Sequence, residues 1–212
     1  MYAYLHGFAS GPTSSKGRWL ADRFAETGRK LELPDLTPGP DGFEKATPLT
    51  MLDEVSRLLA TQPNERHLLI GSSLGGLLAA VHAERHPETI DRLVLLAPAF
   101  RLAERWRQRM DPAELQRFRE QGSMEVDHYA TGTRRTMPYR FLEDADTLPD
   151  YPNVTVPVLC IAGRRDELVP LADVEAFVER TKTAQLVVVD DDHELKASLP
   201  LIWQKIVEFA GF

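Results

Sequence analysis

The chain has 212 residues, of which 43% are hydrophobic and 27% are charged, and its formal net charge is −7. This length and composition predict one folded domain over residues 1–212 and argue against a disordered chain. The negative charge argues against nucleic acid or an anionic membrane as the main partner, because both need a basic surface. No apolar run of about 18 residues and no typical signal peptide occurs, so we expect no membrane span and a cytoplasmic location.

Short apolar runs rich in β-formers alternate with longer amphipathic runs, which predicts an α/β fold. A mostly parallel sheet with helices on both faces is typical of this pattern. In chain order, the predicted elements are strand Tyr2–His6, helix Ser15–Thr27, strand Lys30–Leu33, helix Leu49–Thr61, strand His67–Gly71, helix Leu74–His86, strand Leu93–Ala97, strand Pro157–Ala162, helix Leu171–Thr181, strand Gln185–Val189 and helix Leu199–Phe209.

The stretch Arg101–Asn153 interrupts this alternation. It is rich in charge, lacks any run typical of a strand, and begins with one or two helices over Arg101–Glu120. Because it is too long for an ordinary connection, it predicts a small helical lid inserted over the strand ends. Its arginines are expected to form a solvated face rather than to recognise an acidic substrate. Its large side chains, some of which are candidates for an acyl pocket while most pack the lid, are Trp106, Met110, Phe118, Met124, Tyr129, Met137 and Tyr139.

The pentapeptide Gly71-Ser72-Ser73-Leu74-Gly75 matches the pattern G-x-S-x-G. It lies where a predicted strand runs directly into a predicted helix, the context that a nucleophile elbow requires. In such a turn the serine hydroxyl stands above the sheet edge, and the helix N-terminus favours developing negative charge. Ser73, with a glycine two residues to either side, is therefore the candidate nucleophile rather than Ser72.

A serine nucleophile needs a base and a group that orients the base. Of the six histidines, only His128 and His193 follow Ser73 with room for an acid between them. His193 follows the last predicted strand, where active sites form in open α/β sheets, whereas His128 falls in the predicted lid. Asp166 follows strand Pro157–Ala162 and is the candidate acid. The expected catalytic triad is Ser73, Asp166 and His193.

Acyl transfer also needs two donors aimed at the oxyanion. The backbone N–H of Leu74 is one candidate, and the N–H of Phe8, in the loop after the first strand, is the other. His6 is expected to brace that loop through hydrogen bonds. The single cysteine, Cys160, lies in an apolar strand and is expected to be a packed thiol.

These motifs resemble the α/β-hydrolase superfamily over nearly the whole chain. The segments Tyr4–Pro12 and Gly71–Gly76 are similar to the small bacterial esterases of the YqiA/YcfP-like group, and Gly163–Pro170 resembles the acid loop of the superfamily. The first hairpin of the full fold has no counterpart, so we expect about six strands. The resemblance implies carboxylesterase or thioesterase activity with neither a metal nor an organic cofactor.

The sequence thus predicts a serine hydrolase that cleaves a small-molecule ester or thioester through an acyl-enzyme intermediate. A lactonase, amidase, C–C hydrolase or perhydrolase would use the same triad, because fold and triad do not separate these chemistries. A ligand-binding module with low turnover is a further alternative. The natural substrate, the preferred acyl chain length and the oligomeric state are left open by the sequence.

Overall fold

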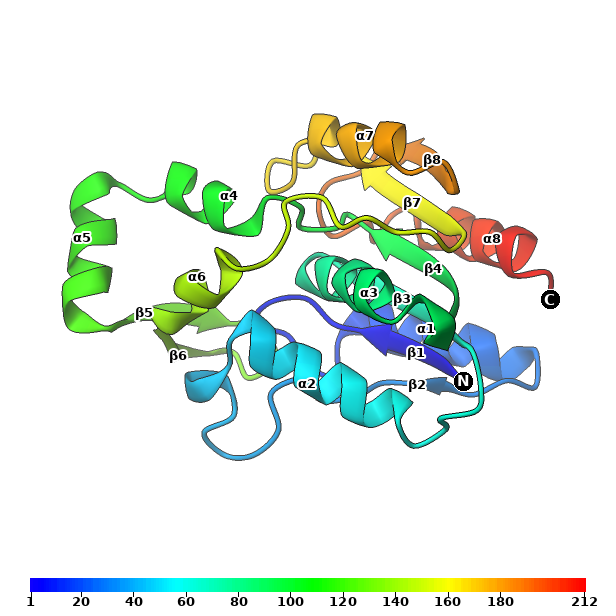
Figure 1. Ribbon diagram of the computed structural model, residues 1–212, viewed down its shortest axis with the longest axis horizontal. Helices are drawn as coiled ribbons and strands as arrows, with labels where there is room; N and C mark the ends of the chain where they lie inside the picture. The colour runs from blue at the N-terminus through cyan, green and yellow to red at the C-terminus, as the bar shows by residue number, and fades with distance from the viewer.

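Six parallel strands form the central sheet of the computed structural model, which describes residues 1–212 (Figure 1). The strands are β1 (Tyr2–Leu5), β2 (Leu31–Glu32), β3 (His67–Ser72), β4 (Ile90–Leu96), β7 (Val158–Gly163) and β8 (Ala184–Val189), in the spatial order β2-β1-β3-β4-β7-β8. Every neighbouring pair is parallel. All six predicted strands are present, and the predicted parallel sheet is confirmed.

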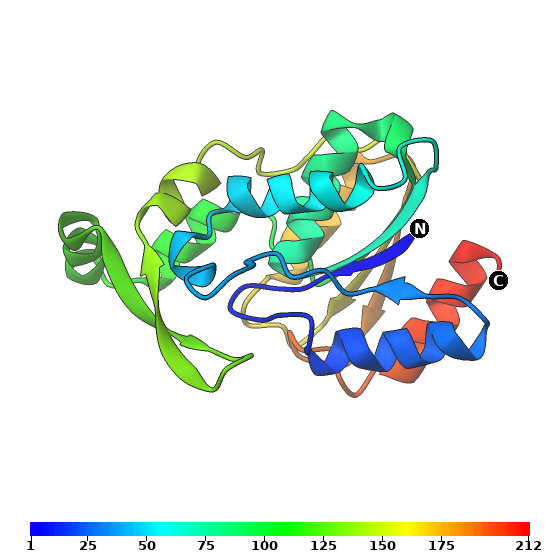
Figure 2. The same ribbon diagram turned by 90° about the horizontal axis from the view of Figure 1, so that it is seen from below.

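Helices cover both faces of this sheet. Figure 2 shows α1 and α8 on one face, while α2 and α3 cover the other. The helices are α1 (Ser15–Glu26), α2 (Pro48–Leu59), α3 (Leu74–Arg85), α4 (Leu102–Arg109), α5 (Pro112–Gln121), α6 (Arg140–Ala145), α7 (Leu171–Arg180) and α8 (Leu199–Ala210), with short 3-10 helices η1 (Phe43–Lys45) and η2 (Pro87–Thr89). None of these helices combines the length and the apolar character needed to cross a membrane.

The alternation of side chains along the strands divides the core into two clusters. Leu69 of β3 packs in the cluster that contains α2, α3 and α7, while Leu68 and Ile70 pack in the cluster that contains α1 and α8. Successive side chains of a strand point to opposite faces, so a parallel strand covered on both sides is apolar throughout. This explains the continuous apolar runs from which the strands were predicted.

The 101–153 segment lies between β4 and β7 and differs from the predicted helical lid. After α4 and α5 the chain forms an antiparallel hairpin of β5 (Ser123–His128) and β6 (Thr133–Pro138), followed by α6. The prediction that this stretch contains no strands was therefore wrong for residues 123–138. Met124, Val126 and His128 alternate with the exposed Glu125 and Asp127, and a single covered face of this kind gives no continuous apolar run.

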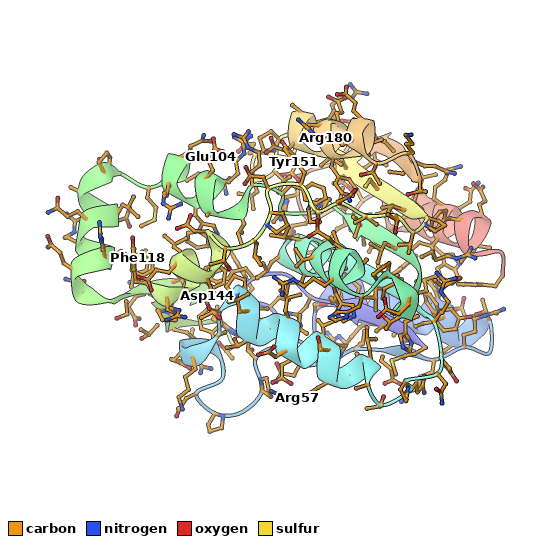
Figure 3. The ribbon with its side chains drawn as sticks, in the orientation of Figure 1. Arg57, Glu104, Phe118, Asp144, Tyr151 and Arg180 are labelled. Atoms are coloured by element: carbon orange, nitrogen blue, oxygen red, sulfur yellow. The ribbon has the colours of Figure 1, made fainter.

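The two ends of the 101–153 segment are attached to α7. The buried carboxylate of Asp173 in α7 accepts hydrogen bonds from Arg101 and Arg105, with Arg105 Nε 2.6 Å from Oδ2. At the other end, the guanidinium of Arg180 lies 4.7 Å from the ring centroid of Tyr151; both side chains are labelled in Figure 3. These contacts fix both ends of the segment where it leaves the sheet and returns to it.

Two further arginines of the segment also form ion pairs rather than a solvated face. Arg135 of β6 pairs with Glu44 of η1, and this contact joins the hairpin to the main body of the protein. Arg107 of α4 pairs with Asp146, just after α6. Half-exposed pairs of this type contribute little stability individually, about 0–1 kcal/mol, but they orient the elements that they join.

Candidate active site

Ser73 occupies the sharp turn between β3 and α3. Its backbone has φ 53° and ψ −117°, a conformation that residues other than glycine rarely adopt. Two hydrogen bonds hold the turn: Ser73 N–H donates to the carbonyl of Leu96 at 2.9 Å, and Ala99 N–H donates to the carbonyl of Ser73 at 3.0 Å. The strained backbone is therefore fixed by β4 and by the chain that follows it.

The two flanking glycines are required by close backbone contacts. A Cβ atom at Gly75 would lie 2.1 Å from the carbonyl oxygen of Leu5, and one at Gly71 would lie 2.3 Å from the carbonyl oxygen of Gly75. No side chain fits in either place. The glycines of the G-x-S-x-G pattern thus let α3 start directly against β1 and β3.

The side chains of Ser73, His193 and Asp166 form one hydrogen-bonded series. His193 Nε2 lies 3.0 Å from Ser73 Oγ, and His193 Nδ1 lies 2.8 Å from Asp166 Oδ2. The Asp166 side chain is only 2% exposed, and its other oxygen accepts hydrogen bonds from the N–H groups of Leu168 and Val169, each at 2.8 Å. These bonds fix the orientation of the carboxylate, whose Oδ2 is left to accept a hydrogen bond from the N–H at His193 Nδ1.

The loop that carries His193 is held by Asp191, one of three consecutive aspartates that the sequence leaves as either turn caps or solvated residues, and Asp191 is a cap. Its buried carboxylate accepts hydrogen bonds from the N–H of Asp192 at 2.9 Å and from the N–H of Ser198 at 2.8 Å. Burial raises the pKa of Asp191, but these hydrogen bonds outweigh burial and the pKa is lowered overall. A Cβ at Gly163 would lie 2.5 Å from the Asp191 carbonyl oxygen, so the acid and histidine loops are in direct contact.

The other histidines discussed above do not contact Ser73. His6 is buried, its Nδ1 lies 2.9 Å from the carbonyl oxygen of Gly7, and its Nε2 accepts from the N–H of Leu36 at 3.2 Å. Burial lowers the pKa of His6, consistent with a neutral ring that donates through one nitrogen and accepts through the other. The predicted bracing of this loop is confirmed. His128 lies on the hairpin, where its Nδ1 is 3.0 Å from Thr131 Oγ1.

The backbone N–H groups of Phe8 and Leu74 both lie at the mouth of the site and donate to no acceptor within the protein. Leu74 follows Ser73 directly. Phe8 follows Gly7, where a Cβ would lie 3.4 Å from the Ser73 Cβ atom. The Phe8 ring makes edge-on or tilted contacts with the rings of Phe43, Trp106 and Phe141, which fix its loop. Two unoccupied donors beside one serine can bind an oxyanion.

Ser73 and His193 open onto a cleft of about 1020 Å³. The 101–153 segment supplies much of its apolar wall, namely Leu102, Trp106, Met110, Val126 and Tyr129. Phe118 and Met137, by contrast, are each only 1% exposed. Phe118, labelled on α5 in Figure 3, packs against Tyr139 within the segment, whereas Met137 lies beside Phe43 and Met51 of the main body. Some of the large side chains of this stretch thus line the cleft, while others are buried and pack the segment.

The cleft is also lined by a buried lysine that no sequence pattern predicts. Lys16, near the start of α1, is 8% exposed, and its Nζ donates to Ser72 Oγ at 3.0 Å. In the sequence it is one charged residue among others on an amphipathic helix, so no local signal marks it as buried.

Nucleophiles and metal ligands outside this site are few. Cys160 is fully buried in β7 and burial raises its pKa, so the expected packed thiol is confirmed. No group of three or more His, Cys, Asp or Glu side chains is arranged to hold a metal ion.

The parallel sheet, the strand–Ser73–helix turn and the loops after β7 and β8 define an α/β-hydrolase fold. Solved structures agree on the fold. The α/β hydrolase domain-containing protein 10 from mouse superposes with a TM-score of 0.81 at 20% identity, covering 99% of this chain and 89% of the mouse chain. Est1E from Butyrivibrio proteoclasticus with ferulic acid bound gives a TM-score of 0.79 at 21% identity, covering 99% of this chain and 89% of its own.

The chain belongs to the family described as "Uncharacterised protein family (UPF0227)", whose model matches residues 1–211. This match confirms the resemblance to the YqiA/YcfP-like group that the motifs indicated. A curated relative is the pimeloyl-[acyl-carrier protein] methyl ester esterase of Vibrio vulnificus (strain CMCP6). It is 27% identical, over 79% of this chain and 76% of that protein.

Proposed function

We propose that this protein is a carboxylic ester hydrolase that works through an acyl-enzyme intermediate on Ser73. In the first half-reaction, Ser73 Oγ attacks the carbonyl carbon of the ester while His193 Nε2 takes the hydroxyl proton. The amides of Phe8 and Leu74 donate to the oxyanion that forms. When the tetrahedral intermediate collapses, the leaving alcohol takes the proton back from His193.

The second half-reaction repeats the same steps with water as the nucleophile. His193 removes a proton from water, which attacks the acyl carbon, and the carboxylic acid leaves as Ser73 regains its proton. Asp166 fixes the ring orientation and tautomer of His193 and stabilises the imidazolium formed in each half-reaction. Asp166 is well suited to this role because the N–H groups of Leu168 and Val169 occupy its other oxygen.

The observation that carries the proposal is the unbroken series from Ser73 Oγ through His193 to the buried carboxylate of Asp166, with separations of 3.0 and 2.8 Å. Two free backbone N–H groups beside the same serine support it further. The name of the Vibrio vulnificus relative and its ester substrate point to the same reaction class. We therefore propose a small-molecule carboxylic ester as the substrate, with a thioester as the related alternative.

Covalent labelling with a fluorophosphonate, together with hydrolysis of p-nitrophenyl acetate, tests the proposal. The wild type is expected to take up one label per chain, and Ser73→Ala and His193→Ala are expected to lose both label and turnover, by about 10⁴-fold or more. Ser72→Ala is the matched control, because it removes the neighbouring hydroxyl and should still be labelled. Full hydrolysis by Ser73→Ala, or tight ligand binding without labelling of the wild type, would overturn the assignment.

A panel of substrates then resolves the reaction within this class. p-Nitrophenyl esters of increasing acyl length should be compared with acyl-CoA thioesters, lactones and amides at equal concentration. The apolar wall formed by Leu102, Trp106 and Met110 favours esters with an apolar acyl group over peptides or sugars. A higher kcat/KM for lactones or amides than for any linear ester would replace esterase by that activity.

A further inference from the structure

The side chain of Lys16 is a buried cation without a counter-ion. It is 8% exposed, and no carboxylate lies within salt-bridge distance of its Nζ, which has Ser72 Oγ at 3.0 Å as its one hydrogen-bond acceptor. An ammonium group carries three donors, so two are left for other partners. Buried lysines are normally paired with an acid, and one that is not paired points to a ligand or to another role.

The one side-chain hydrogen bond of the Lys16 ammonium is to the hydroxyl of Ser72, while the carboxylates that act on its charge, Glu194, Asp166 and Asp191, lie beyond salt-bridge distance. Tyr4 and Ser14 lie beside Ser72, and Ser14 Oγ caps α1 by accepting from the N–H of Gly17 at 3.2 Å. These hydroxyl groups can solvate an ammonium ion, but they do not neutralise it. A ligand with a negative charge would supply what this group of side chains lacks.

Lys16 lies on the wall of the same cleft that contains Ser73 and His193. Lys16 contacts the side chain of Ser72, the residue directly before the proposed nucleophile. The 101–153 segment lines the cleft with apolar side chains such as Trp106 and with charged ones such as Arg109, whereas β1, the start of α1 and the end of β3 contribute mainly polar groups. A substrate that bridges the two sides needs an apolar part and a polar, negatively charged part.

We propose that Lys16 is a specificity-determining residue that binds a carboxylate carried by the ester substrate. The inference rests on the proposed ester hydrolysis, and adds to it that the preferred esters are those of acids or alcohols with a free carboxylate group. The carboxylate accepts hydrogen bonds from Lys16 Nζ and neutralises its charge in a site shielded from water, where such bonds are strong.

The other charged groups of the cleft already have partners within the protein: Arg105 pairs with Asp173, and Arg109 donates to the carbonyl oxygen of Glu167. Arg134 donates to the carbonyl oxygen of Glu125. Asp166 and Asp191 use their oxygens on backbone N–H groups and on His193, and neither contacts Lys16. Glu194 is exposed and pairs with Lys196 at 2.8 Å. Lys196 lines the same cleft, but its side chain is 53% exposed, so its charge is solvated and already paired. This makes Lys196 a matched control for Lys16.

The test compares carboxylated and neutral esters of equal length in the same protein. One series places the carboxylate on the acyl group (mono-p-nitrophenyl succinate, glutarate and adipate against the neutral p-nitrophenyl esters). A second places it on the leaving group (4-carboxyphenyl acetate against phenyl acetate). The readout is the ratio of kcat/KM for the charged ester to that for the neutral one, in wild type, Lys16→Met, Lys16→Gln and Lys196→Met. Lys16→Gln retains a hydrogen-bond donor for Ser72, and thermal unfolding of each variant establishes that it is folded.

In at least one series, both Lys16 variants are expected to lower this ratio by about tenfold or more, while Lys196→Met changes it by about twofold or less. A ratio that stays constant in both series, with both esters slowed equally, would mean that Lys16 only supports Ser72, and the inference would be wrong. If Lys196→Met lowered the ratio equally, the preference would come from the overall electrostatic potential of the cleft and not from Lys16, and the inference would again be wrong. Inactivity of the wild type on every ester would instead refute the proposed function itself.

Discussion

Replacing Lys16 by Met is expected to stabilise the fold at neutral pH, although it removes a charge beside the proposed active site. Burial lowers the pKa of Lys16 from its ordinary 10.5 to about 8. A difference of this size means that the ammonium form of Lys16 lowers the free energy of unfolding by about 3 kcal/mol at neutral pH. Met has a similar volume but loses the hydrogen bond to Ser72, worth about 1 kcal/mol. The net gain is about 2 kcal/mol, or a rise in Tm of about 4–8 °C.

The sign of the pH dependence provides a second check. Between about pH 8 and pH 10.5 the unfolded chain binds a proton at Lys16 that the folded chain does not, so the stability of the wild type rises with pH in this window. Lys16→Met lacks this contribution. Its advantage in the free energy of unfolding should therefore be largest below pH 8 and should shrink as the pH approaches 10.5.

Urea unfolding followed by circular dichroism, at pH values from about 7 to 10.5, measures both effects. Tyr4, whose pKa is raised by burial above its ordinary 10.0, is present in both proteins, so its own titration cancels to first order in the difference. Lys196→Met serves as the control, because an exposed and solvated lysine should change stability by no more than about 0.5 kcal/mol. A less stable Lys16→Met protein at pH 7, or a difference that stays constant with pH, would refute the view that Lys16 is a desolvated cation.

Three further substitutions, one with a matched control at Gly28, test the geometry of the site. Asp166→Asn should lower kcat on p-nitrophenyl acetate by about 10⁴-fold with an unchanged circular dichroism spectrum, because an amide no longer fixes the histidine tautomer; a loss below about tenfold would contradict the triad. Gly75→Ala should destabilise the protein by about 3 kcal/mol or more in urea unfolding, because its Cβ would lie 2.1 Å from the Leu5 carbonyl oxygen. Gly28→Ala, where only the positive φ of 73° opposes the change, should cost about 1 kcal/mol, and equal losses at both positions would contradict this reasoning. Trp106→Ala widens the apolar wall and should shift the preferred p-nitrophenyl ester toward longer acyl chains, whereas an unchanged chain-length profile would place the acyl group elsewhere.

The sheet and the turn at Ser73 were predictable because their sequence signals arise from strong local constraints. A parallel strand covered on both faces is apolar at most positions, so β3 and β7 are visible as short apolar runs. At Gly71 and Gly75 the backbone contacts exclude any Cβ atom, so the spacing of the two glycines directly reflects the geometry of the turn. Signals of this kind can be recognised in a single sequence.

The hairpin of the 101–153 segment could not be predicted in the same way. Its strands have one covered face, and polar or charged residues such as Asp127 and Arg134 occupy exposed positions. Its position depends on contacts with distant parts of the chain, for example the pair between Arg135 and Glu44, which are 91 residues apart. No local pattern encodes such a contact, so the charged stretch after Glu120 gives no prediction of strands.

The burial of Lys16 could not be predicted for a different reason. Lysine normally lies at the surface, and only the tertiary packing places this one inside. If stability alone determined this position, an apolar residue would serve better, since a desolvated ammonium without a counter-ion opposes folding. Residues that lower stability in a well-packed region are a recurrent feature of functional sites, where activity and stability have opposing requirements. The contact with Ser72, the place of Lys16 in the cleft and its missing counter-ion therefore have one common explanation: the counter-ion arrives with the substrate. If this explanation holds, Lys16→Met should gain stability and lose selectivity for carboxylated esters for the same reason, namely that it removes an unpaired positive charge.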